Sequence, residues 1–160
     1  MEIIYNTGRR WQKRWREVLA GLAELEKWSR GEGDPGLSGE QRKKTPEQFS
    51  LDCLHLKDWL INDPAAAVNK KTVEDHAHGS PSISLAMAVA NTDKHHTRRP
   101  GQTTAWVARA VTPADGSGSV SFLVEWQKPD GSSGSTDALD MATRAVSDWR
   151  SFFAAHGLTE

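Results

Sequence analysis

The spacing of the apolar residues changes twice along this chain of 160 residues, and this change limits the folds that are open to it. Up to residue 98, apolar side chains recur every three or four positions, which places them on one face of a helix. Between residues 102 and 135 they alternate with polar residues, as in strands, and from 136 to 157 the helical spacing returns. The pattern predicts an α+β fold, in which an antiparallel helical bundle carries an appended antiparallel β-hairpin or small meander and a C-terminal helix.

Composition shifts and turn residues divide the chain into five segments of a single expected domain, residues 1–160. Glycines, a proline and mixed charges indicate that the second segment is a flexible loop. The segments are a basic, tryptophan-rich helix (1–30), a flexible loop (31–44), a helical core (45–98), a β-hairpin region (102–135) and a C-terminal helix (136–157).

Capping residues predict where the later helices start. Thr45 followed by Pro46 predicts one helix start, and Ser80 followed by Pro81 predicts the next. Thr136 is expected to cap the C-terminal helix. Residues 65–79 are expected to form only a short helical turn and loop, so the helices on either side are predicted to be antiparallel neighbours.

Charge and composition exclude several classes of protein. Lys and Arg number 20 and Asp and Glu 21, so only a local basic patch would attract nucleic acid. The single Cys53 excludes an intrachain disulfide, and no apolar run approaches the length of a membrane span. The chain is therefore expected to be cytoplasmic, with no membrane partner. No nucleotide-loop or zinc motif is present, and the pair His76 and His78 is incomplete as a metal site, so no cofactor or metal is expected.

Basic residues crowd into the first half of the first predicted helix. They are Arg9, Arg10, Lys13, Arg14 and Arg16. Positive charge is unfavourable at a helix N-terminus, because the macrodipole favours anions there. The pattern indicates either an anionic neighbour or a solvated helix face.

Two polar clusters lie on the helices expected to be neighbours. In "CLHLKDW", His55 lies one turn from both Asp52 and Asp58. In "NTDKH", Asn91 and His95 are four residues apart and share a face. If the clusters meet, they form either a phosphate site with a histidine general base or a satisfied polar network that fixes the register of the two helices.

The stretches "CLHLKDWLIND", "VANTDKHH" and "DWRSFFAAHGL" resemble a group of small uncharacterised bacterial proteins that share an "HLKDW" helix and an "N-x-x-KH" helix. The resemblance covers about residues 45–157. The helical part is also distantly similar to HEPN domains, in which an Arg, often followed by Asn, precedes a His four to six residues on. Many HEPN domains are metal-independent ribonucleases with a site formed across a dimer, and several serve as toxins or in phage defence. The resemblance implies a HEPN-like bundle.

Mapped onto this sequence, the resemblance makes Asn91 the polar residue and His95 the catalytic histidine of the motif. Ala90 stands where the motif has its Arg, which departs from the pattern because that Arg stabilises the phosphate. Lys94 or Arg98 would have to substitute for it, although neither stands at the motif position.

Two hypotheses for function follow. The first is RNA handling, as a divergent ribonuclease with His55, Asn91 and His95 in catalysis. Its expected phosphate-binding residues are Lys94, Arg98, Arg99, Arg9, Arg10, Lys13 and Arg14. The alternative is a non-catalytic protein-interaction or regulatory module, with a protein partner or a homodimer. RNA handling needs the basic residues on one side of the molecule, whereas an interaction module needs an exposed apolar patch with one or two tryptophans.

Overall fold

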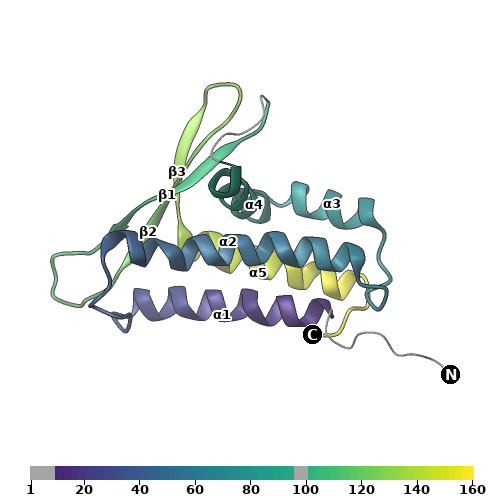
Figure 1. Ribbon diagram of the computed structural model, residues 1–160, viewed down its shortest axis with the longest axis horizontal. Coiled ribbons are helices and arrows are strands. Elements are labelled where there is room, and N and C mark those ends of the chain that lie inside the picture. The colour runs from purple at the N-terminus through teal and green to yellow at the C-terminus, as the bar shows by residue number, and fades with distance from the viewer. Residues whose placement is uncertain (1–9, 96–100) are drawn as a thin grey trace.

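The computed structural model describes residues 10–95 and 101–160, with the backbone alone for residues 93–95. Five helices and three strands lie in these ranges, which confirms the α+β class (Figure 1). In chain order they are α1 (Trp11–Ser29), α2 (Gly39–Asn62), α3 (Lys70–Gly79), α4 (Pro81–His95), β1 (Thr104–Val111), β2 (Ser121–Gln127), β3 (Ser133–Asp137) and α5 (Ala138–Ala155).

The helices pack in a ring in which α1 and α4 each contact both α2 and α5. In Figure 1, α1, α2 and α5 lie alongside one another, whereas α4 is seen nearly end-on and crosses α2. The sheet covers one side of this bundle, with β1 on α2 and α4, and with β2 and β3 on α5. The prediction that α2 and α4 are antiparallel neighbours is therefore wrong, although the two helices do pack together.

The reason for that error is α3. The link between α2 and α4 holds a full helix of ten residues, where only a short turn and loop were predicted. Asn69 caps α3, because its side chain accepts a hydrogen bond from the backbone N–H of Lys71. Only Val73 and Ala77 of α3 are buried, so the apolar periodicity that reveals a helix in sequence is almost missing there.

The apolar stripe of α1 points into the core as predicted. Trp11, Trp15, Val18, Leu25 and Trp28 are all buried. The ring of Phe153 from α5 lies 4.6 Å from that of Trp11 and 4.9 Å from that of Trp15, measured between centroids. Aromatic pairs at these distances contribute stability beyond the area that they bury, so α1 and α5 are held together by their largest side chains.

A carboxylate from elsewhere in the chain lies at the N-terminus of α1. The carboxylate of Asp63, just after α2, accepts a hydrogen bond of 2.8 Å from the backbone N–H of Trp11 and is buried. Its second oxygen accepts one of 2.9 Å from the N–H of Ala65. Arg10, which precedes α1, has no side-chain cap, so Asp63 supplies the anion that the macrodipole and the basic first turns favour.

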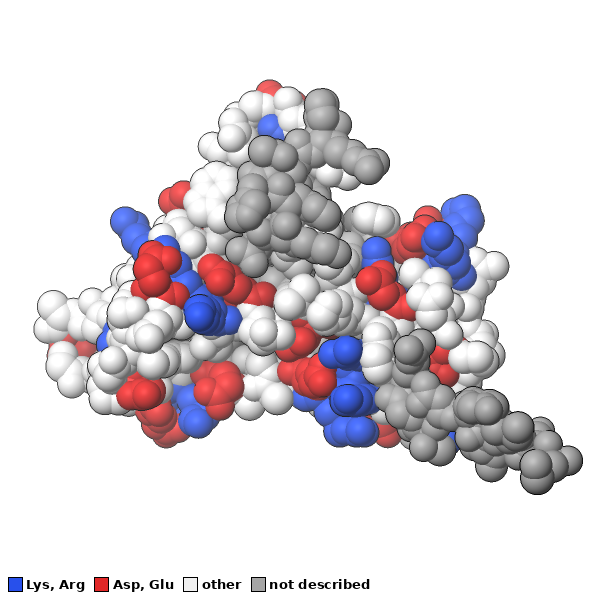
Figure 2. All heavy atoms as spheres, viewed as in Figure 1, with Lys and Arg blue, Asp and Glu red and all other residues white. Residues whose placement is uncertain are grey.

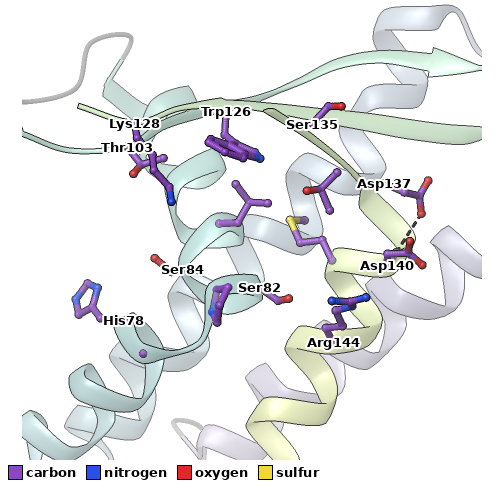
Figure 3. Close-up of a pocket in the computed structure, with 15 residues that line it drawn as sticks. His78, Ser82, Ser84, Thr103, Trp126, Lys128, Ser135, Asp137, Asp140 and Arg144 are labelled. Carbon is purple, nitrogen blue, oxygen red and sulfur yellow. Dashed lines mark hydrogen bonds between the residues drawn. The ribbon is translucent and has the colours of Figure 1, made fainter. Parts of the chain in front are cut away.

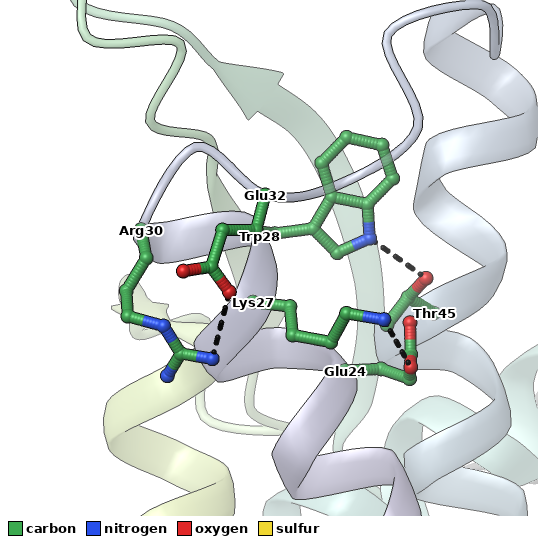
Figure 4. A network of polar contacts seen from close by, with 6 residues as sticks. All are labelled: Glu24, Lys27, Trp28, Arg30, Glu32 and Thr45. Atoms are coloured by element: carbon green, nitrogen blue, oxygen red, sulfur yellow. Dashed lines mark hydrogen bonds and ion pairs between the residues drawn. The ribbon is translucent and has the colours of Figure 1, made fainter.

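Helix α2 begins earlier than predicted. Ser38 is its N-cap, and the side chains of Ser38 and Gln41 exchange hydrogen bonds with each other's backbone in a capping box. The second half of the predicted loop 31–44 is thus helical, and Pro46 lies inside the helix. Thr45 is therefore not the N-cap of α2. Its hydroxyl instead accepts a hydrogen bond of 3.3 Å from the indole N–H of Trp28 (Figure 4).

The sheet is an antiparallel meander in the order β1-β2-β3, as one of the two predicted alternatives had it. The buried side chains Val107, Phe122 and Val124 face the helices. The register shifts between Val107 and Arg109, which leaves Ala108 as a bulge. Thr136 pairs with Val124 inside β3, so the predicted cap of α5 is wrong by one residue, and Asp137 is the N-cap instead.

The loop between β1 and β2 docks on the C-terminal end of α1. The N–H of Val120 donates to the carbonyl of Trp28 at 2.8 Å, and the hydroxyl of Ser119 donates to the carbonyl of Ser29 at 2.8 Å. Gly31 has a φ of +75°, and a Cβ there would lie 2.4 Å from the carbonyl oxygen of Ser117. This junction therefore requires glycine, both for its dihedral angle and for the closeness of the two backbones.

Candidate functional site

The predicted acidic–histidine cluster on α2 is divided among different environments. His55 is half-buried, and its Nδ1 atom is enclosed without a hydrogen-bond partner among the described residues. Asp52 is buried and lines a groove between α1 and α2 together with Glu17. Asp58 is exposed on the surface of α2. The three side chains therefore do not form one site.

Burial sets the chemistry of Asp52. Its carboxylate accepts a hydrogen bond of 3.0 Å from the side-chain amide of Gln48. Loss of solvent raises the pKa of the Asp52 carboxyl, the hydrogen bond from Gln48 acts in the opposite direction, and the nearby charge of Glu17 adds to the rise. Asp52 is thus a buried structural carboxyl on the α1 side of α2, away from α4.

On α4, only part of the second predicted cluster is described. Asn91 is half-buried in the last turns of a helix that packs against α2, and no hydrogen bond joins it to His55 within the described part of the chain. The side chains of Lys94 and His95 fall outside the described residues. Arg9, Arg98 and Arg99 also lie outside them. A shared site of His55, Asn91 and His95 remains a prediction.

The described basic residues at the start of α1 differ in their surroundings, since Arg14 is engaged with its neighbours and the others are exposed. Arg14 is half-buried, its guanidinium lies 4.3 Å from the centre of the Trp59 ring, and it pairs with Glu17 at 2.8 Å. Arg10 and Lys13 are exposed. In Figure 2, Lys and Arg gather over the first half of α1, whereas they are interspersed with Asp and Glu over the rest of the described face. Any attraction of nucleic acid to this face is therefore local to the start of α1.

Two large apolar side chains are exposed among the described residues, Trp106 at 39% and Val111 at 40%. Both stand on the face of β1 that points away from the helices, since their neighbours Ala105 and Ala110 pair with the inward-facing Trp126 and Phe122. Arg109 lies between them along β1 on this face and pairs with Leu123 of β2.

The structure contains a cleft that was not predicted. It has a volume of about 710 Å³ and lies between the first turns of α4, the first turns of α5 and the end of the sheet where β2 stops (Figure 3). Its polar and charged lining includes Ser82 and Ser84 of α4, Asp140 and Arg144 of α5, and Lys128 just after β2. Volumes of 300 to 1,000 Å³ are typical of sites for small molecules.

The indole of Trp126 forms an aromatic wall of this cleft. Trp126 is half-buried and projects from β2 toward the helices (Figure 3). It lies directly against the backbone of β3, because a Cβ at Gly134 would be 2.4 Å from its Cζ2 atom. The ammonium of Lys128 lies 5.3 Å from the indole centre, within the range of a cation–π contact. The apolar side chains of Leu85 and Met141 add to this wall.

Two cations of the cleft are not engaged in an ion pair within the described structure, although the carboxylate of Asp140 lines the same cleft one turn before Arg144. Neither Lys128 nor Arg144 forms an ion pair with a described residue, and both side chains are exposed. The carboxylate of Asp137 is occupied as the N-cap of α5, where it accepts a hydrogen bond of 3.0 Å from the N–H of Asp140. The positive groups are thus available to a ligand, whereas Asp137 serves the helix.

Sequence reasoning overlooked this cleft although one signal was present. Alternation along β2 puts Trp126 and Lys128 on the same face of the strand, next to each other. The remaining residues come from α4 and α5, and only the tertiary fold brings them there.

Comparisons of the chain with protein-family models, with curated proteins and with solved structures find no match. The resemblance to HEPN domains therefore stays a prediction. Within residues 10–95 and 101–160 no group of three or more His, Cys, Asp or Glu side chains is arranged to hold a metal ion. None of the helices in those ranges combines the length and apolar character needed to cross a membrane.

Proposed function

We propose that the protein is a binding module that holds a small organic anion, with a phosphate or carboxylate group, in the cleft between α4, α5 and the sheet. The observation that carries this proposal is the pair of cations, Lys128 and Arg144, which line a cleft of about 710 Å³ and form no ion pair with a described residue. Arg144 approaches from α5 and Lys128 from the end of β2, with Trp126 between them (Figure 3).

The physical argument rests on the setting of these charges. A guanidinium donates two parallel hydrogen bonds to a carboxylate or phosphate, which gives direction as well as attraction. The indole of Trp126 and the side chains of Leu85 and Met141 exclude water from one side of the cleft. Two cations that line one cleft can attract the same anion, so an anion gains more here than at an isolated surface lysine.

The test is a titration followed by ¹H–¹⁵N NMR spectra, with inorganic phosphate, small organic phosphates and small carboxylates as separate probes. Binding in the cleft shifts the amide resonances of Ser82, Ser84 and Lys128 in a saturable way. The Arg144→Ala variant weakens this binding by roughly tenfold or more, which corresponds to loss of a hydrogen bond to a charged group. Arg16→Ala is the matched control, since Arg16 is an exposed helical arginine of α1 outside the cleft.

Two results would reject this function. One is that none of the probes shifts the cleft resonances at millimolar concentration. The other is that Arg144→Ala and Arg16→Ala weaken binding equally, since binding would then follow total charge rather than the cleft.

A second candidate is the predicted RNA-handling function at the contact between α2 and α4. The observation in its favour is the enclosed Nδ1 of His55, since an unsatisfied buried polar atom costs about 1–3 kcal/mol and favours a polar partner on the neighbouring helix. Loss of RNA cleavage in His95→Ala with an unchanged melting temperature supports this function. If the parent protein does not cleave RNA and His95→Ala melts several degrees lower, the results support the structural polar network between the two helices instead.

A further inference from the structure

The cleft offers more than positive charge, and its other groups narrow the class of ligand. The first of these is a flat aromatic surface. The indole of Trp126 packs against the backbone of Gly134, where any side chain would overlap the ring. An indole at the wall of a cleft is a surface on which a planar ring stacks.

The second feature is one acceptor for hydroxyl hydrogens, the carboxylate of Asp140. It lines the cleft and makes no hydrogen bond or ion pair with another described residue. It lies on the same helix as Arg144 and one turn before it, so the two side chains are neighbours. A carboxylate next to a guanidinium repels a ligand that is anionic throughout, but it accepts hydrogen bonds from neutral hydroxyl groups beside the anion.

The third group consists of the hydroxyls of Ser82 and Ser84 on the facing wall (Figure 3). The hydroxyl of Ser80 accepts a hydrogen bond from the backbone N–H of Ile83, and the carbonyl of Ser80 accepts one from the N–H of Ser84. The serine hydroxyls are therefore the main donors that the first turn of α4 offers to a ligand, and they suit phosphate oxygens as well as sugar hydroxyls.

We infer that the cleft binds a nucleoside phosphate, with its base against Trp126, its ribose hydroxyls toward Asp140 and its phosphate held by Arg144 or Lys128. This inference rests on the proposed function, because it names the anion that the same cleft takes. A nucleoside phosphate is the ligand class that joins a planar ring, neutral hydroxyls and a phosphate in one molecule. The ligand is a free nucleotide, since the cleft has the volume of a small-molecule site.

The experiment uses isothermal titration calorimetry on the full chain with the four ribonucleoside 5′-monophosphates. Ribose 5-phosphate, which has no base, and the four nucleosides, which have no phosphate, are titrated alongside. We expect one monophosphate to bind at least tenfold tighter than both ribose 5-phosphate and its own nucleoside. Ribose 5-phosphate that binds as tightly as every monophosphate, in a manner lost in Arg144→Ala, overturns the nucleotide inference while the proposed function stands.

Variants of the aromatic wall test the role of the ring. Trp126→Leu is expected to weaken monophosphate binding by roughly 5- to 150-fold, the range for loss of one base stack, and to leave ribose 5-phosphate unaffected. Gly134→Ala displaces the same indole without removing it and is expected to act in the same direction. Trp106→Leu, on the outer face of the sheet, is the control and leaves binding unchanged.

Circular dichroism spectra confirm that each variant is folded, and Trp126→Phe replaces Trp126→Leu if the latter is not. Unchanged monophosphate binding in both Gly134→Ala and the folded Trp126 variant overturns the inference. A ribotetranucleotide with a 5′-phosphate distinguishes the source of the nucleotide. Binding no tighter than that of the monophosphate supports a free nucleotide, whereas binding at least tenfold tighter overturns it in favour of an RNA end.

Discussion

Replacement of Asp63 by alanine tests how far α1 depends on a carboxylate from another part of the chain. In the folded protein Asp63 is buried and accepts two backbone hydrogen bonds, from Trp11 at 2.8 Å and from Ala65 at 2.9 Å. Alanine accepts neither, and the N–H groups at the start of α1 and in the turn after α2 lose their partners. The negative charge opposite the N-terminus of α1 is lost as well.

The size of the effect follows from these contacts. A hydrogen bond to a charged group contributes about 1.5–3 kcal/mol, so the loss of both lowers the free energy of unfolding by about 3–6 kcal/mol. For a chain of this length each kcal/mol corresponds to roughly 2–4 °C in melting temperature. Asp63→Ala is therefore expected to melt roughly 6–24 °C lower. Asp63→Asn keeps a carbonyl oxygen as acceptor and is expected to lose less than half as much, because it removes mainly the charge.

The assay is urea denaturation at pH 7 and low salt, followed by circular dichroism, with thermal melts as a second measurement. Asp58→Ala is the matched control. It removes an exposed carboxylate of α2 whose only ion pair in the described structure, to Lys57, is long at 3.8 Å, and it is expected to change stability by less than about 1 kcal/mol. If Asp63→Ala is as stable as Asp58→Ala, the account of α1 capping by Asp63 is wrong.

Two further predictions concern single side chains. Burial raises the pKa of Asp52, so the ionised carboxylate destabilises the folded state once the pH exceeds this raised pKa. Asp52→Asn, which cannot ionise, should be more stable than the parent at pH 7 and equally stable below the ordinary Asp pKa of about 3.9. Denaturation curves that show no gain in stability at pH 7 would contradict this. Gly31→Ala should lower the free energy of unfolding by about 2–5 kcal/mol, because residue 31 has a φ of +75° and an added Cβ would lie only 2.4 Å from the carbonyl oxygen of Ser117. The control Gly39→Ala, whose Cβ meets nothing within 4 Å, should melt close to the parent, and equal melts for both variants would refute the argument.

The sequence predicts the fold best where large apolar residues repeat. The stripe from Trp11 to Trp28 and the alternation through Phe122 and Val124 are visible without a structure, and both are buried as expected. The start of α2 was harder to predict. Thr45 followed by Pro46 is a stronger local signal for a helix start than the capping box of Ser38 and Gln41, which lies among glycines. The first turns of α2 depend on tertiary packing, which the local sequence pattern does not indicate.

The candidate site was harder to predict than the fold. Sequence spacing identifies residues that share a helix face, such as His55 with Asp52, but it does not show which neighbour each will meet. Asp52 faces the groove beside α1, and α4 crosses α2 because α3 lengthens the link between them. The cleft joins residues from 78 to 144 along the chain, so its shape exists only after the sheet and helices have assembled.

The contact between α1 and α5 bears on how the chain folds as it leaves the ribosome. Trp11 and Trp15 pack on Phe153, a residue made about 140 positions later. During synthesis, the aromatic face of the first helix is without that partner until Phe153 has emerged. Such long-range contacts slow folding and leave apolar surface exposed in the nascent chain, more so than in a bundle whose contacts join sequence neighbours.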